Sequence, residues 1–133
     1  MYILGILTST MGNILDAALR AIRAVDAGPA WTVIRTYTTS ADMQTAADLT
    51  ASPGAGLKVV ADDILISADT AMSFSVQMET SANVLAKVYL PANGTVQITL
   101  RDGLKGDAAA KKLQGKASAS GNVAVTVCWH KEA

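Results

Sequence analysis

The sequence predicts a mainly β protein, an antiparallel β-sandwich or jelly roll with one amphipathic helix near its N-terminus. Two observations predict the sheets directly. Apolar and polar side chains alternate over residues 73–79 and again over residues 122–130, and a period of two is typical of strands with one buried face. The third observation is that several such segments follow one another at short intervals between turn residues, which favours a sandwich or jelly roll.

The N-terminal part predicts a short strand over residues 1–10 and a helix over residues 13–25. The helix is indicated by apolar residues that recur at spacings of three and four: Ile14, Leu15, Ala18, Leu19, Ile22 and Val25. Asn13 can cap its first turn, and Gly28-Pro29 ends it. The apolar stripe packs either on the domain's own core or on a partner subunit; two basic residues are too few for a membrane-surface helix.

The whole chain, with the strand at residues 1–10 included, is predicted to have seven or eight strands. The others are expected at residues 31–39, 57–67, 73–80, 84–90, 95–100 and 122–130, with a possible edge strand or helical turn within 40–56. Asp62-Asp63 marks a bulge or bend, and Pro91-Ala92-Asn93-Gly94 is typical of a tight turn. Residues 101–120 are interpreted as a polar excursion with one helical turn at 107–113. We therefore divide the chain into an arm, residues 1–28, and a sandwich, residues 29–133, within a single domain overall.

Composition narrows the function classes. Half of the residues (50%) are apolar but only 5% are aromatic, and the mean hydropathy is +0.30, which favours either a subunit interface or thin sheets packed with small and β-branched residues. Eleven basic and 11 acidic residues balance, whereas a nucleic-acid binder needs a basic surplus. One cysteine excludes an internal disulfide. With neither a basic leader nor an apolar run of ~18 residues, we expect a soluble protein made in the cytosol.

The reactive side chains do not form a recognisable site. Cys128 and His130 supply two possible zinc ligands where about four are needed, so we expect them to be ordinary residues on the less buried face of a terminal strand. Asp62, Asp63 and Asp69 lack the alternating pattern of a calcium loop. The sequence thus predicts no catalytic residue, no metal site, no cofactor and no enzymatic activity.

The layout of residues 57–131 resembles a known class of proteins. It comprises GLKVVADDILISADTAMSFSVQ, then VYLPANGTVQITLRDGLKGDAAAKKL, and finally GNVAVTVCWHKE. This succession of strands and turns resembles small β-sandwich structural proteins of tailed bacteriophages, in particular jelly-roll capsid cement (decoration) proteins. The resemblance does not include the N-terminal helix. It implies a non-enzymatic protein, made in the host cytoplasm and bound as a dimer or trimer to the outside of the assembled head, where it bridges neighbouring major capsid subunits.

The expected partners are therefore further copies of the chain and the major capsid protein, with neither nucleic acid nor a membrane. The basic residues between 101 and 116 are either solvated or dock on an acidic protein surface. We predict interface contacts from eight residues: Ile14, Leu15, Leu19, Ile22, Trp31, Trp129, Lys111 and Lys112. The alternative function is a carbohydrate- or receptor-binding module of a phage fibre or tail, which an exposed cluster of aromatic residues would favour.

Overall fold

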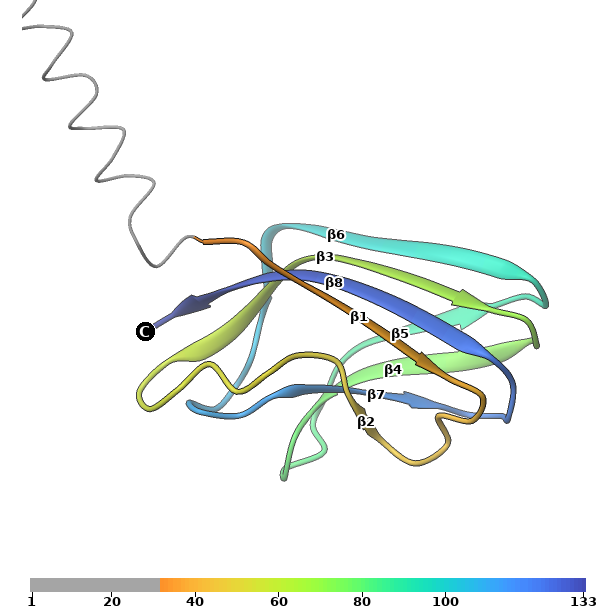
Figure 1. The fold of residues 1–133 in the computed structure, drawn as a ribbon, viewed down its shortest axis with the longest axis horizontal. Coiled ribbons are helices and arrows are strands. Elements are labelled where there is room, and N and C mark those ends of the chain that lie inside the picture. The colour runs from red at the N-terminus through yellow and green to blue at the C-terminus, as the bar shows by residue number, and fades with distance from the viewer. Residues whose placement is uncertain (1–31) are drawn as a thin grey trace, which may run out of the picture. The chain divides into compact units, whose positions relative to one another are not determined.

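Eight strands form the part of the chain that the computed structural model describes, residues 32–133 (Figure 1). They are β1 (Ile34–Ser40), β2 (Ala47–Asp48), β3 (Lys58–Ala68), β4 (Met72–Met78), β5 (Val84–Leu90), β6 (Gly94–Lys105), β7 (Leu113–Ala117) and β8 (Val123–Glu132). Sheet A has the order β1-β8-β3-β6, and sheet B has the order β2-β7-β4-β5. No helix long and apolar enough to cross a membrane occurs among these residues.

The pairing follows one rule. The first strand pairs with the eighth, the second with the seventh, the third with the sixth and the fourth with the fifth, always antiparallel. This is the pattern of one long hairpin folded over into two facing sheets, and it matches the eight-stranded jelly roll. The predicted antiparallel sandwich is therefore confirmed. The predicted strand, helix and arm of residues 1–28, as well as Trp31, lie outside the described residues.

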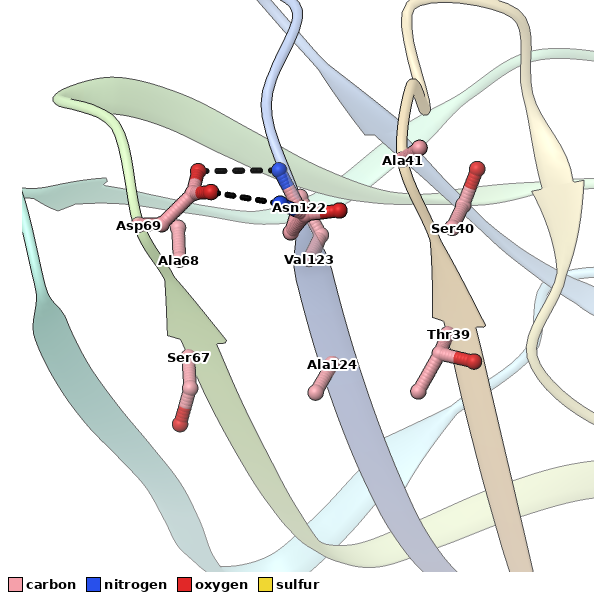
Figure 2. Close-up of a pocket in the computed structure, with 9 residues that line it drawn as sticks. All are labelled: Thr39, Ser40, Ala41, Ser67, Ala68, Asp69, Asn122, Val123 and Ala124. Atoms are coloured by element: carbon pink, nitrogen blue, oxygen red, sulfur yellow. Dashed lines mark hydrogen bonds between the residues drawn. The ribbon is translucent and has the colours of Figure 1, made fainter.

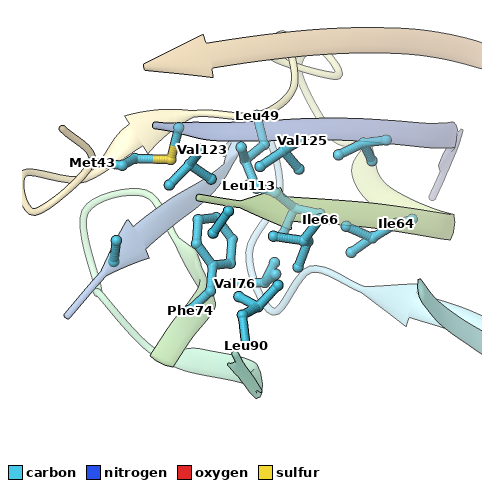
Figure 3. Packing of buried hydrophobic residues seen from close by; sticks show 14 of the residues in the cluster. Met43, Leu49, Ile64, Ile66, Phe74, Val76, Leu90, Leu113, Val123 and Val125 are labelled. Carbon is cyan, nitrogen blue, oxygen red and sulfur yellow. The ribbon is translucent and has the colours of Figure 1, made fainter. Parts of the chain in front are cut away.

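The core lies between the two sheets (Figure 3). The predicted alternation in β8 is confirmed, because Val123, Val125, Val127 and Trp129 are buried and the residues between them are partly exposed. Phe74 in β4 is fully buried on the opposite side of the core. Each fully buried side chain of this size contributes roughly 1.5–3 kcal/mol to folding, so these alternating positions specify which face of each strand points inward.

Two predicted local features are confirmed. The register of β3 against β8 shifts between Ala61 and Asp63, so Asp62 is the extra residue of a β-bulge in this pair. Against β6, Ala61 pairs with Leu104 and Asp63 pairs with Thr99, so the extra residues lie on β6. In the turn between β5 and β6, Asn93 has a φ of 55°, and the N–H of Gly94 donates to the carbonyl oxygen of Pro91 at 3.1 Å. A Cβ at Gly94 would lie 2.6 Å from Cδ of Pro91, which explains why glycine follows asparagine here.

The predicted polar excursion over 101–120 is wrong. β6 continues to Lys105, β7 occupies Leu113–Ala117, and no helical turn forms at 107–113. The inward positions of β7 after Leu113 are Gly115 and Ala117, whose small size hides the alternation of apolar residues. Within residues 40–56, the edge-strand alternative is the one observed, as the two-residue β2.

Candidate functional site

The candidate site lies on the outer face of sheet A, whose four strands are seven to 12 residues long. Strand register arranges its outward side chains in three rows across four strands. The rows, each written in the order β1, β8, β3 and β6, are Arg35, Cys128, Asp63, Thr99; Tyr37, Thr126, Leu65, Gln97; and Thr39, Ala124, Ser67, Thr95. Most of these side chains are small. The shallow central part of the face, called its floor below, is formed by the outward residues of β8, which are Cys128, Thr126 and Ala124.

Two hollows occupy this face. The first is lined by Arg35, Tyr37, Asp63, Leu65, Thr126 and Cys128. The second is lined by the third row on β1, β8 and β3, together with the adjoining residues at the ends of these strands (Figure 2). Ala124 and Thr126 are successive outward residues of β8, so the hollows are neighbours along the strand. Tyr37 and Leu65 flank the floor and are 68% and 43% exposed.

Asp69 closes the end of the second hollow and is held by the fold. Its carboxylate accepts hydrogen bonds from the backbone N–H of Asn122 at 2.8 Å and from the Asn122 side-chain amide at 2.6 Å (Figure 2). It also accepts one from the Thr70 hydroxyl at 3.0 Å. The hydrogen bond from the Asn122 side chain, and after it that from Thr70, lower the pKa of Asp69. The carboxylate is therefore ionised, and it joins the loop after β3 to the start of β8.

Asp63, in the first hollow, is also engaged. The side-chain amide of Gln97 donates to both of its carboxylate oxygens at 3.1 Å, and the hydroxyl of Thr99 donates to Oδ1 at 2.9 Å. Within residues 32–133, the guanidinium of Arg35 forms neither a hydrogen bond nor an ion pair. The first hollow therefore offers a partner one uncommitted cation, an exposed ring and an exposed aliphatic side chain.

A second polar cluster surrounds His130. Its Nδ1 lies 2.8 Å from Oδ2 of Asp62, and its Nε2 lies 3.3 Å from Oε1 of Glu132, whose other oxygen is 3.1 Å from Nζ of Lys105. The expectation that His130 lies on a less buried face is wrong, because the residue is only 4% exposed. The bulge at Asp62 brings a carboxylate to this position and so makes burial of the imidazole possible.

The charges in this cluster shift one another's pKa. Burial lowers the pKa of His130, but the hydrogen bonds and negative charges of Asp62 and Glu132 outweigh it, so the net pKa of His130 is raised. Hydrogen bonds from His130 and Lys105 lower the pKa of Glu132. No group of three or more metal-binding side chains occurs in residues 32–133. The imidazole of His130 lies between the carboxylates of Asp62 and Glu132. The contact with Asp62 joins β8 to β3.

The structure places the predicted interface residues in different environments. Trp129 is 1% exposed and its indole N–H donates to Oγ1 of Thr36 at 2.9 Å, so its side chain is in the core and not at the surface where we expected it. Lys112 forms an ion pair with Asp48 at 2.7 Å, and this contact raises the pKa of Lys112. Lys111 is partly exposed. The arm residues Ile14, Leu15, Leu19, Ile22 and Trp31 lie outside the described residues.

Leu65 is a surface residue that sequence reasoning missed. From the sequence, Tyr37 is only one of several scattered aromatic residues, expected in core or interface packing, and the structure places it in the same row as Leu65. Tyr37 and Leu65 both occupy the outward phase of strands whose inward phase is apolar or partly buried. A large apolar side chain at the solvent phase of a strand is the signal that would have identified them.

Comparisons with known proteins show similarity of fold. No family model and no curated protein matches the chain. Among solved structures, a protein of the disulfide-linked pili of Bacillus endospore appendages is 10% identical, with a TM-score of 0.46 over 74% of this chain and 87% of that one. A chain of the cyanophage Pam1 capsid is 12% identical, with a TM-score of 0.44 over 74% and 84%.

A third structure is a virus-like particle of the extra small virus of the prawn Macrobrachium rosenbergii. Its chain is 10% identical, with a TM-score of 0.40 over 74% of this chain and 78% of that one. Viral capsid proteins are thus among the chains whose folds resemble this sandwich.

Proposed function

We propose that this chain is a non-enzymatic structural protein of a phage particle. It binds the outside of the head and bridges neighbouring major capsid subunits, with the outer face of sheet A as its docking surface. The observation that carries the proposal is that face itself, where Tyr37 and Leu65 are exposed beside a floor of small residues. The resemblance of residues 57–131 to capsid cement proteins supports the same role.

The polar chemistry of the sandwich supports a structural role rather than catalysis. A catalytic acid, base or nucleophile needs to reach a substrate, whereas Asp63, Asp69 and His130 are each bound to other side chains of the fold. Within the described residues, no buried side-chain nitrogen or oxygen lacks a hydrogen-bond partner. The buried polar groups therefore stabilise the sandwich. The outer face of sheet A is left to act by shape and by contact of its exposed apolar side chains with a partner.

The docking face has the features of a protein interface. Binding energy in such interfaces is concentrated in a few anchors, most often tryptophan, tyrosine or arginine. Tyr37 and Arg35 supply such anchors here, and Leu65 adds an exposed apolar contact beside them. A stable interface buries about 1,600 Å² in total. Binding to several sites on one lattice adds avidity without new contacts.

A reconstitution experiment tests the proposal. Particles that lack this chain are mixed with the purified protein and separated by sedimentation. Leu65→Glu places a charge in the centre of the docking face and is expected to weaken particle binding about tenfold or more. Val84→Glu is the matched control, because Val84 is an exposed apolar residue of β5 in the other sheet. Equal binding of both variants, or no binding of the wild type, contradicts the proposal.

The second candidate is the carbohydrate- or receptor-binding module. It is favoured by the placement of Tyr37 in one hollow with Arg35 and Asp63, because sugar sites combine an aromatic ring with polar groups. However, the other exposed tyrosine of the described chain, Tyr89, belongs to β5 in sheet B, so the two rings do not form a cluster. A glycan array on which the protein binds a defined sugar, with binding lost in Tyr37→Ala, favours this function over the first.

A further inference from the structure

β1 is the least protected edge strand among the described residues. It pairs with β8 through seven successive residues and has no register shift. Within residues 32–133 it has no strand on its other side. Exposed edges present unpaired backbone N–H and C=O groups to other chains, and proteins protect them with charged side chains, especially lysine, with proline, with bulges or with very short strands. β1, with the sequence IRTYTTS, is seven residues long and has no lysine, proline or bulge, and Arg35 is its one charged residue.

The other three edges of the sandwich are protected. β6 has a bulge in its pairing with β3 and carries Arg101, Asp102 and Lys105. β5 has a register shift in its pairing with β4 and carries Lys87, whose Nζ lies 5.7 Å from the centre of the Tyr89 ring. β2 is only two residues long. The contrast singles out β1 as the edge open to strand addition.

We propose that a second copy of the chain pairs with β1 in antiparallel orientation, with the two-fold axis at Tyr37. In this register Arg35 faces Thr39 of the second copy, and Thr36 faces Thr38 of the second copy. Arg35 is the only charged residue of β1, so no like charges lie opposite each other. The two Tyr37 side chains, each 68% exposed in the single chain, meet across the axis as a cross-strand aromatic pair.

The pairing turns two four-stranded sheets A into one continuous sheet. Such a contact is isologous and closes as a dimer, so it does not propagate into a fibre. The two docking faces then lie side by side with the Tyr37 pair between them. The inference deepens the proposed function, because it names the surface through which copies associate, and it can be tested separately from particle binding.

The test compares Tyr37→Lys with Tyr89→Lys in the full-length protein by sedimentation equilibrium. Both residues are exposed tyrosines on edge strands, one in each sheet, so Tyr89→Lys is a matched control. Lysine at position 37 places two positive charges across the axis. We expect a wild-type dimer, a dissociation constant raised about tenfold or more in Tyr37→Lys, and an unchanged constant in Tyr89→Lys. Unfolding curves verify that both variants are folded.

Disulfide trapping provides the second measurement. In a Cys128→Ser background, which removes the only native cysteine, Tyr37→Cys is expected to form an intermolecular disulfide because opposed strand residues lie within bonding reach, whereas Tyr89→Cys is not. A monomeric wild type, an unchanged dimer in a folded Tyr37→Lys, or equal trapping at both positions overturns the proposal. Particle binding that fails while the dimer persists contradicts only the proposed function.

Discussion

The Nδ1 atom of His130 lies 2.8 Å from Oδ2 of Asp62. Asp62 is the extra residue of the bulge in β3, and its carboxylate reaches the neighbouring strand because the bulge displaces it from the regular ladder. Glu132 lies on the other side of the same imidazole, at 3.3 Å from Nε2. The bulge therefore has a definite consequence, namely a buried histidine held between two carboxylates near the C-terminal end of β8.

This arrangement predicts that His130 stabilises the fold more at mildly acidic pH than at alkaline pH. The pKa of His130 in the fold is raised above its ordinary value of 6.5. A raised pKa means that the stabilising charge is fully present below pH 6.5 and is lost as the pH rises through the folded-state pKa. The difference in unfolding free energy between the wild type and His130→Gln, measured by urea denaturation, should therefore decrease from pH 6 to pH 8.5.

Asp62→Asn provides the control for this effect, because it removes one of the two negative charges and leaves Glu132 with its contact to Lys105. In the Asp62→Asn background, the difference in unfolding free energy between the protein with His130 and the protein with His130→Gln should depend less on pH. A difference that is constant or increases with pH would contradict the account.

Thr36→Val is expected to destabilise the sandwich by about 1–3 kcal/mol, because it leaves the buried indole N–H of Trp129 without its acceptor. Thr38→Val is the matched control on the same face of β1, since the Thr38 hydroxyl lies 3.5 Å from its acceptor, the carbonyl oxygen of Asp48, which is a weak contact. Urea denaturation measures both. In a Trp129→Phe background, Thr36→Val and Thr38→Val should lower the stability by similar amounts. If Thr36→Val still costs more, the hydrogen bond from Trp129 is not the cause of the difference.

Gly115→Ala is expected to destabilise the protein by about 1–3 kcal/mol through overpacking. A Cβ at Gly115 would overlap Cζ of Phe74 and would lie 3.1 Å from Cδ2 of Leu49, and both side chains are fully buried. Gly106→Ala should cost less, because its nearest neighbour is the end of the flexible Met78 side chain at 3.2 Å. Thermal unfolding that ranks the two substitutions in the opposite order argues against the packing of β7 described above.

Removing residues 1–27 should weaken self-association or particle binding and leave the sandwich folded. The core cluster of the described residues runs from Met43 to Trp129, and we expect these residues to hold the sandwich together without the arm. Circular dichroism tests the fold, and sedimentation with and without particles tests association. A truncated protein that assembles and binds particles as well as the full chain shows that the arm has no such role.

The strands were predictable where one face is buried and its residues are large. β5 occupies the expected residues, Val84–Leu90, and β8 follows the alternation of Val123, Val125 and Val127. β7 was missed because glycine occupies the inward position beneath Phe74. A small residue that fits beneath a large one belongs to the same core, but it gives no signal of hydrophobicity in its own segment.

The candidate site was less predictable than the fold, because tertiary pairing creates it. Tyr37, Thr126 and Leu65 form one row across three strands that are far apart in the sequence. Likewise, the burial of His130 depends on Asp62, which lies 68 residues earlier. Local patterns indicate which face of a strand points outward, but only the strand register shows which outward residues become neighbours.

A cryo-EM reconstruction of particles that carry this chain tests the central claim most directly. The account predicts density for the eight-stranded sandwich on the outer surface of the head, with the outer face of sheet A against neighbouring major capsid subunits. A particle that lacks this density on its head, or one in which the outer face of sheet A points to solvent without a partner, would contradict it.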